Sequence, residues 1–188
     1  MSTPPDRQDS ILDAAFHAFA SYGYRRTSMD DIARGAGFSR TALYLHFRSK
    51  EDLFRQLAQR FFEQAIQDVA QALAVPGLSA ADSILAALVA KDGKFMAAVM
   101  ATPHGAELMD AGFAIAGEIA VEGEAQMLAL FTGWMTQRGV PADLGTPGEI
   151  AAALMVALKG LKSSSLSLPD YRSRQRQLAM VFGRAIGG

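Results

Sequence analysis

The sequence contains no cysteine. The chain therefore forms no disulfide bond, offers no thiolate to a metal and has no cysteine nucleophile. Its three histidines, His17, His46 and His104, are scattered, which argues against a histidine metal site. No glycine-rich phosphate loop follows a strand pattern. We therefore expect no enzyme, no metal and no cofactor.

Long uninterrupted apolar runs are also missing, so the sequence predicts no membrane-spanning helix. The first ten residues, MSTPPDRQDS, are polar and proline-rich, unlike a signal peptide. Both features favour a cytoplasmic protein. Half of the 188 residues are hydrophobic, enough to bury a core as one large domain or two small ones.

An excess of charge of one sign is absent, because the formal net charge is −1. The distribution is uneven, however. Residues 24–60 contain eight basic and four acidic side chains, whereas residues from 61 onward contain nine basic and twelve acidic ones. A positive segment on an acidic body suits phosphate binding by one part of the molecule.

Apolar spacing and capping signals predict an all-α fold, with no convincing strand or repeat. A first helix opens at residues 3–6 and carries an apolar stripe that ends at Tyr22. We expect further helices over residues 50–73, from 80 to about 91 and from about 113 to 138. Two more helices start at 146–149 and near 169–170, the last with Ser167 as its cap.

Residues 27–53, TSMDDIARGAGFSRTALYLHFRSKEDL, carry the most information about function. Ser28 and Asp31 form a capping box that starts a helix near Met29. The sequence Gly35-Ala36-Gly37 ends this helix, since glycine adopts positive φ at little cost. Ser39 then caps a second helix. Two short helices joined by a tight turn are typical of a helix-turn-helix.

The apolar positions of the second helix determine which side chains it exposes. Leu43 and Phe47 are four residues apart and are expected to face inward. The side chains left pointing outward are Arg40, Thr41, Tyr44 and His46. A further capping box, Ser49 to Asp52, starts the next helix and places Lys50 at its N-terminus. The backbone N–H groups and the positive charge there can bind a phosphate.

These stretches resemble the N-terminal domain of the TetR (tetracycline repressor) family. The resemblance rests on ILDAA, FASYGY, TSMDDIA and AGFSRTALYLHFRSKEDL, and covers roughly residues 8 to 55 without a gap. It implies a homodimeric, ligand-responsive bacterial transcription regulator, most often a repressor. It also implies a DNA-binding domain over residues 1–52 and a helical effector-binding and dimerisation domain over residues 53–188.

The resemblance assigns DNA contacts to matching positions. Arg40 and Thr41 match base-reading positions; arginine can bond guanine and the threonine methyl suits thymine. Tyr44, His46 and Lys50 match phosphate contacts, although Tyr44 can instead be a core residue and His46 a plain surface residue. Thr27 and Ser28 are expected primarily to cap a helix. Their hydroxyl or backbone N–H groups can also contact the DNA backbone.

The remainder of the chain is less specific. His104, at a helix break beside Pro103, is a candidate for a polar contact to a ligand, although a lone loop histidine more often has no special role. Large, adaptable apolar side chains suit a small hydrophobic or aromatic effector, and the candidates are Met96, Met100, Phe113, Met127, Phe131 and Trp134. For any single one of these apolar residues a place in the core is favoured, but as a group, given the resemblance, some of them should line a pocket. Glu118 and Glu122 share one helix face and either attract a cationic effector or face solvent, with solvent favoured.

Apolar stripes on the last two helices predict a two-fold dimer interface built as a four-helix bundle. The candidate interface residues are Leu154, Leu158, Leu161, Leu178, Val181 and Phe182. The alternative is that both stripes are buried within one subunit. An alternative function also stays open, namely a helical ligand-binding or scaffolding bundle without functional DNA readout.

Overall fold

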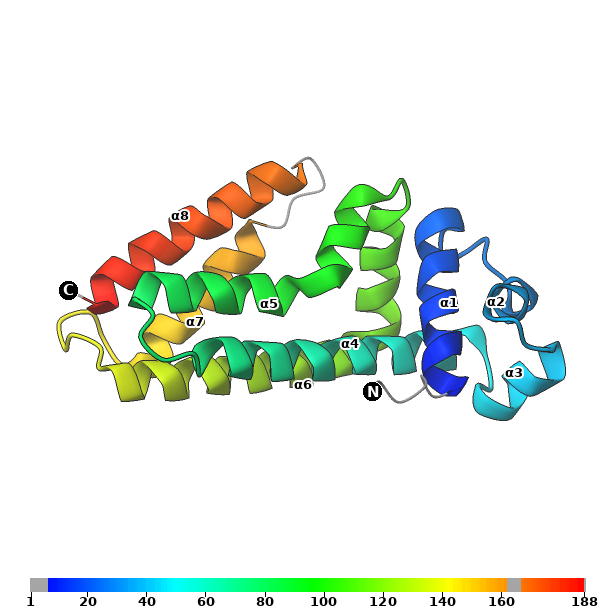
Figure 1. The fold of residues 1–188 in the computed structure, drawn as a ribbon, viewed down its shortest axis with the longest axis horizontal. Helices are drawn as coiled ribbons and strands as arrows, with labels where there is room; N and C mark the ends of the chain where they lie inside the picture. Colours follow the sequence, from blue (N-terminus) through cyan, green and yellow to red (C-terminus); the bar gives the residue numbers. More distant parts are fainter. Residues whose placement is uncertain (1–6, 162–166, 188) are drawn as a thin grey trace. The chain divides into compact units, whose positions relative to one another are not determined.

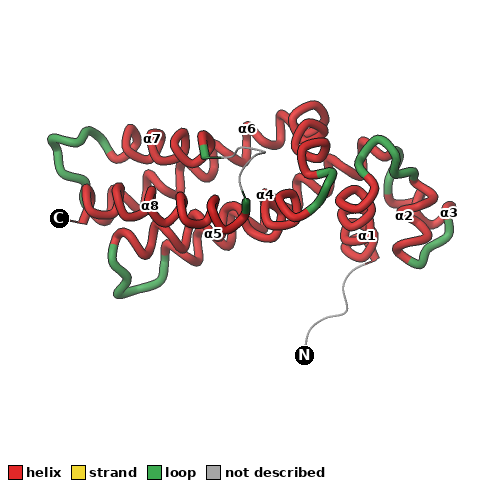
Figure 2. The backbone as a smooth tube through the Cα atoms, turned by 90° about the horizontal axis from the view of Figure 1, so that it is seen from above, coloured by secondary structure: helices red, strands yellow, loops and turns green. Residues whose placement is uncertain are grey.

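The computed structural model describes residues 7–161 and 167–187, without the side chains of residues 93–95, 98 and 113. Within this part helices and loops account for the whole backbone, which confirms the all-α prediction (Figures 1 and 2). None of its helices is both long and apolar enough to cross a membrane. The helices are α1 (Arg7–Tyr22), α2 (Met29–Ala36), α3 (Arg40–His46), α4 (Lys50–Leu73), α5 (Ala80–Ala101), α6 (Gly105–Arg138), α7 (Pro147–Gly160) and α8 (Leu168–Gly187).

Most helix starts follow the predicted caps. Thr146 and Glu149 form a complete capping box at α7, with Pro147 in the first turn. The Ser167 hydroxyl accepts a hydrogen bond from the Asp170 N–H at 3.2 Å and caps α8 as predicted. The predicted opening of the first helix, residues 3–6, lies outside the described residues.

Two predicted boundaries were wrong. Helix α5 does not end near residue 91 but continues to Ala101, because Gly93 alone does not stop it and Pro103 is the next strong breaker. Helix α6 starts at Gly105 rather than near residue 113, and departs from helical geometry at Ala116, where φ is −116° and ψ is 21°. The apolar stripe of α1 also ends earlier than predicted, since Tyr22 is 62% exposed.

The chain divides into two compact units. The first comprises the residues up to Phe61 together with Ala98–Ala120, and the second comprises Phe62–Ala97 and Val121–Gly188. Helices α4, α5 and α6 each contribute to both units. The expected boundary at residues 52 and 53 therefore falls inside α4, and the first unit includes a segment of α6 that is distant in sequence.

The core of the first unit joins α1, α2, α3 and the start of α4 through fully buried apolar side chains. Phe19 of α1 packs its ring against Tyr24 and Phe54, with ring centroids 5.3 and 5.7 Å away. Arg60 of α4 pairs with Asp9 and Asp13 of α1 at the same junction. The packing fixes α2 and α3 on a rigid support, which positions the exposed residues described below.

The second unit contains a buried polar cluster between α5 and α8. The Asp92 carboxylate accepts hydrogen bonds from the Tyr171 hydroxyl and from the Gln175 side-chain amide. All three side chains are buried. Gly183 allows α8 to approach α5 closely, since a Cβ atom there would lie 2.3 Å from the Ala81 Cα. The long α5 is thus held against α8 by polar contacts as well as by close packing.

Candidate nucleic-acid interface

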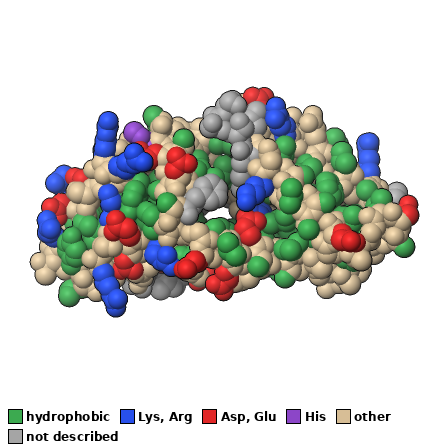
Figure 3. Space-filling model, turned by 180° about the vertical axis from the view of Figure 1, so that it is seen from behind, with side chains coloured by type: hydrophobic (Ala, Val, Ile, Leu, Met, Phe, Trp, Pro, Cys, Tyr) green, Lys and Arg blue, Asp and Glu red, His purple; other side chains and the backbone are tan. Residues whose placement is uncertain are grey.

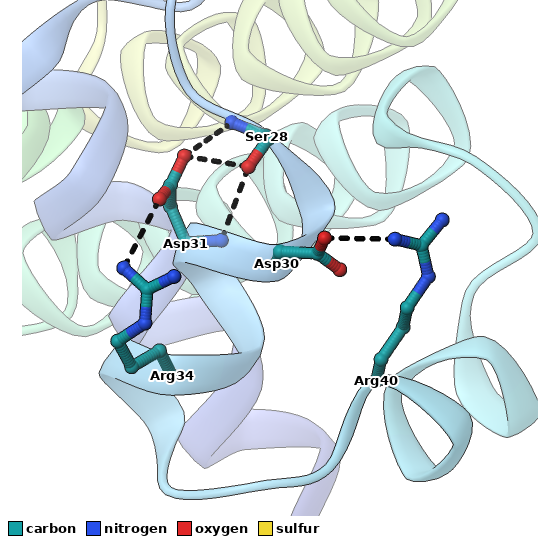
Figure 4. A network of polar contacts seen from close by, with 5 residues as sticks. All are labelled: Ser28, Asp30, Asp31, Arg34 and Arg40. Atoms are coloured by element: carbon teal, nitrogen blue, oxygen red, sulfur yellow. Dashed lines mark hydrogen bonds and ion pairs between the residues drawn. The ribbon is translucent and has the colours of Figure 1, made fainter.

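Helices α2 and α3 are joined by a turn whose geometry follows from a few residues. Ser28 and Asp31 form the predicted capping box: the Ser28 N–H and hydroxyl donate to the Asp31 carboxylate, and the Ser28 oxygen accepts from the Asp31 N–H (Figure 4). Gly37 ends α2 with φ of 74°, and Ser39 caps α3 through the Ala42 N–H at 3.1 Å. The predicted helix-turn-helix geometry is therefore present.

Helix α3 separates a buried face from an exposed one. Leu43 and Phe47 are fully buried, as predicted. The four side chains predicted to point outward are all exposed: Arg40, Thr41, Tyr44 and His46. A helix held by two buried anchors thus presents polar and aromatic groups to solvent, which is the surface that DNA recognition requires.

Arg40 is held by an ion pair in this structure. Its Nη1 lies 2.7 Å from the Asp30 Oδ2 on α2. Figure 4 shows the two side chains pointing toward one another. The Arg40 guanidinium carbon also lies 5.4 Å from the centre of the Tyr44 ring, one turn further along α3. Both partners of the ion pair are exposed, so the contact orients Arg40 without removing it from solvent.

Thr27 does not stand at the surface as expected. Its side chain is 2% exposed. Its hydroxyl donates to the Gly23 carbonyl at 2.7 Å and approaches the Ala18 carbonyl at 3.2 Å. The Thr27 hydroxyl therefore stabilises the connection from α1 to α2 and offers no donor to DNA, whereas Ser28 is exposed.

The ammonium group of Lys50 also binds inside the protein. Its Nζ donates to the carbonyls of Tyr24 and Thr27 at 2.9 and 3.0 Å, lies 3.4 Å from the Arg25 carbonyl, and sits 4.5 Å from the centre of the Tyr24 ring. These contacts connect the start of α4 to the loop between α1 and α2. An ammonium has three donors, so this side chain has little capacity left for a phosphate.

Leu45 was not among the residues predicted to face outward. It is 81% exposed, more than any other large hydrophobic side chain among the described residues. The spacing contained the signal, because Leu45 follows Thr41 by four residues and therefore shares its outward face.

Several arginines stand around α2 and α3. Arg34, Arg40 and Arg48 are exposed, and Lys and Arg side chains project where α1–α3 lie, at the left of Figure 3. Neighbouring carboxylates are engaged in caps. A hydrogen bond from the Ser28 side chain lowers the pKa of Asp31, and one from the Arg48 backbone N–H lowers the pKa of Asp52. Both acids therefore stay ionised at neutral pH, so the positive charge here is local and moderate.

The predicted effector residues fall into both compact units. Met96, Met127 and Phe131 are buried in the second unit, where Trp134 is partly exposed beneath Arg138. Met100 and His104 belong to the first unit, and the described residues do not include the Phe113 side chain. Glu118 and Glu122 are exposed. No group of three metal-ligating side chains occurs among the described residues.

The two predicted dimer stripes differ in exposure. Leu154 and Leu158 of α7 are buried in the core of a single chain, so they are not part of a surface that a second copy could cover. Leu161, Leu178 and Phe182 are partly exposed, and Val181 is 66% exposed. Val156, which is 71% exposed, and Met180 were missed. The side of α7 opposite the predicted stripe therefore faces outward.

Comparison with protein families identifies the N-terminal segment. Residues 11–57 match the family described as bacterial regulatory proteins, tetR family. The matched segment contains most of α1, all of α2 and α3, and the beginning of α4. It therefore coincides with the candidate interface.

Curated relatives match part of the chain. The transcriptional activator FasR of Mycolicibacterium smegmatis is 40% identical over 68 residues, 36% of this chain and 31% of FasR. The transcriptional repressor KstR2 of the same organism is 32% identical over 103 residues, 55% of this chain and 46% of KstR2. The chain thus spans less than half the length of these two relatives.

Solved structures extend the likeness to the whole fold. SmeT, the repressor of the Stenotrophomonas maltophilia multidrug efflux pump SmeDEF, aligns with a TM-score of 0.64 at 20% identity, over 95% of this chain and 88% of SmeT. SmeT has also been solved in complex with triclosan. At this level of identity the likeness concerns the fold.

Proposed function

We propose that this chain, whose residues 11–57 match the tetR family of bacterial regulatory proteins, is a sequence-specific DNA-binding transcriptional regulator. It acts as a homodimeric repressor in the cytoplasm and is released from its operator by a small ligand. The observation that carries the proposal is the exposed face of α3, where Arg40, Thr41 and Tyr44 stand on a helix anchored by two buried side chains.

In this proposal α3 enters the major groove of operator DNA. Arg40 bonds the two acceptors of a guanine and Tyr44 donates to a phosphate, with His46 beside it. Lys50 contributes through its backbone N–H at the start of α4, a helix of 24 residues. Its side chain instead supports the loop between α1 and α2. Ser28 remains an exposed candidate for the phosphate backbone.

Dimerisation supplies the affinity for DNA that the modestly charged helix-turn-helix of one subunit lacks. The exposed apolar residues of α7 and α8, Val156, Met180 and Val181, form the contact surface that we propose, flanked by Leu161, Leu178 and Phe182. A two-fold dimer places two copies of α3 one helical turn of DNA apart, about 34 Å. The operator is then a pseudo-palindrome.

The effector that we propose is a small hydrophobic or aromatic molecule. Support comes from the methionine and aromatic side chains of the second unit, chiefly Met96, Met127, Phe131 and Trp134, and from SmeT, which binds triclosan. The coupling between effector and operator is typically about 1–3 kcal/mol and is reciprocal, so operator DNA weakens effector binding as well.

Fluorescence anisotropy with the DNA that flanks the protein's own gene tests the proposal. The wild type and Tyr44→Ala are compared on this DNA and on a scrambled duplex across a salt series. Tyr22→Ala is the matched control, because Tyr22 is an exposed tyrosine on α1. We expect tight, selective, salt-sensitive binding that only Tyr44→Ala weakens.

If the flanking DNA shows no selective binding, selection from random-sequence DNA searches for a distant operator. A selection that enriches no sequence leaves the alternative, a helical bundle that binds ligand without reading DNA. For the enriched duplex, Arg40→Ala should cost about 1–3 kcal/mol and relax the preference at one base pair. Equal losses of affinity for operator and random DNA would show that Arg40 does not read a base.

A further inference from the structure

Leu45 is an exposed leucine at the centre of the outward face of α3. Successive residues lie about 100° apart around a helix, so Leu45 lies roughly 200° and Thr41 roughly 160° from the buried Leu43. Both therefore point away from the core that Leu43 and Phe47 anchor. Being four residues apart, Thr41 and Leu45 lie next to each other on the helix surface.

The neighbours of these two residues indicate which partner covers them. Tyr44 and His46 flank Leu45 in the sequence, and Arg40, Arg34 and Arg48 are exposed nearby on α2, α3 and the following turn. Exposed arginines on the same two helices and the following turn, two of them paired with Asp30 and Asp31, do not suit a second basic surface. Together with the apolar Leu45 they suit a polyanion whose groove contains apolar groups, and double-stranded DNA combines phosphates with the C5 methyl group of thymine in its major groove.

We propose that Thr41 and Leu45 form an apolar reading strip that selects thymine through its C5 methyl group. This inference rests on the proposed function and adds specificity to it: each half-site contains at least one thymine whose methyl group packs against Leu45. Arg40, which precedes Thr41 and pairs with Asp30, exchanges that partner for a base of a neighbouring base pair. Hydrogen bonding and methyl contact then specify adjacent positions.

A methyl-deletion experiment tests the strip. A duplex is first selected from random-sequence DNA by the wild-type protein. Each thymine is then replaced singly by deoxyuridine, which removes the methyl group and keeps every hydrogen-bonding group. At the thymine that Leu45 contacts, we expect wild-type affinity to fall about fourfold, the equivalent of one buried methyl group.

The same replacements are measured with Leu45→Ala and with Thr41→Ser, which keeps the hydroxyl and removes the methyl group. Leu45→Ala should bind the thymine duplex about tenfold more weakly. It should also lose sensitivity to deoxyuridine at that one position. Because Leu45 is exposed, its replacement should not change the melting temperature. Val121→Ala, at a side chain that is 73% exposed on α6, is the matched control and should behave as the wild type.

The outcomes separate this inference from the proposed function. Selective binding with no methyl effect, or with a methyl effect that Leu45→Ala leaves unchanged, overturns the reading strip and keeps the regulator. A selection that enriches no sequence overturns both. A coupled loss, in which the leucine and the methyl group each matter only in the presence of the other, establishes the contact.

Discussion

The Arg40 guanidinium on α3 and the Asp30 carboxylate on α2 form an ion pair with a 2.7 Å N–O distance. The pair joins the two helices of the helix-turn-helix across ten residues of sequence. The arginine proposed to read guanine is therefore oriented by its contact with Asp30. Arg40 must exchange its carboxylate partner for a base when DNA binds. Asp30 therefore competes with DNA for the Arg40 guanidinium, and a partner that bonds Arg40 only weakly does not displace it.

Asp30→Asn should therefore strengthen DNA binding while reducing selectivity. Removing an exposed carboxylate frees Arg40 and lowers repulsion from phosphates. An exposed ion pair is worth at most about 1 kcal/mol, so affinity for random DNA should rise by up to about fivefold. Anisotropy on selected and random duplexes measures both changes, with Asp68→Asn as a control for net charge. Weaker binding to random DNA would refute the opposing role of Asp30.

Lys50→Met should destabilise the first unit more than it disturbs phosphate contacts. The Lys50 ammonium binds the carbonyls of Tyr24 and Thr27, and hydrogen bonds from charged groups contribute about 1.5–3 kcal/mol each. We expect the free energy of unfolding in urea to fall by at least about 1 kcal/mol. Below the melting temperature the salt dependence of DNA binding should keep its wild-type slope.

Arg48→Met is the matched control for this comparison, since it removes an exposed cation two residues away. It should leave stability almost unchanged. A fall of about 1 in the salt slope for Lys50→Met would show that the ammonium does contact phosphate.

Gly23→Ala should be more damaging than Gly37→Ala. Both glycines have positive φ, 84° and 74°, so each alanine costs about 1–2 kcal/mol of backbone strain. A Cβ at Gly23 would also lie 2.4 Å from the Glu107 Oε2, whereas nothing lies within 4 Å of one at Gly37. Displacing Glu107 breaks its 2.7 Å hydrogen bond from the Arg25 N–H.

Urea unfolding and hydrogen exchange check this prediction. The difference between the two alanine variants should be about 1 kcal/mol or more. The Arg25 amide should exchange faster in Gly23→Ala and in Glu107→Ala than in the wild type. Equal stabilities for the two glycine variants would rule out the Glu107 contact.

Ser28→Ala should change how stability depends on acid pH. Hydrogen bonds from Ser28 lower the pKa of Asp31 from its ordinary value of 3.8. A carboxyl with a lowered pKa in the folded state stabilises the protein above its ordinary pKa, and this contribution is lost as the pH falls through the folded-state pKa. The variant should therefore show a smaller stability loss below about pH 4. Carbon NMR of the Asp31 carboxyl should show its pKa returning toward 3.8.

Local signals predicted the helix-turn-helix well. The capping boxes of α2 and α7, the positive φ of Gly37 and the start of α4 depend on neighbours a few residues apart. The buried positions of α3 follow from four-residue spacing. The same spacing places Leu45 outward, but an apolar side chain is not among the polar groups expected to contact DNA, so Leu45 was not predicted.

Long-range contacts decided the remaining features. The Lys50 ammonium binds carbonyls more than twenty residues away, and the Thr27 hydroxyl binds the Ala18 carbonyl of α1. Neither group is therefore available to contact DNA, although the local sequence had suggested that it was. Helix α5 continues past residue 91, where Asp92 binds Tyr171 and Gln175 of α8. No spacing rule within one helix contains these partners.

The amino-acid sequence by itself determined the all-α class and the boundaries and faces of α2 and α3, because short-range hydrogen bonding and side-chain periodicity are encoded residue by residue. Only the tertiary structure decided which of those side chains remain free to meet DNA. It placed Leu154 and Leu158 in the core of one chain and left Val156 and Leu45 uncovered. The physical reason is that an amphipathic pattern gives the direction of a side chain, whereas burial depends on what packs against it from elsewhere in the chain.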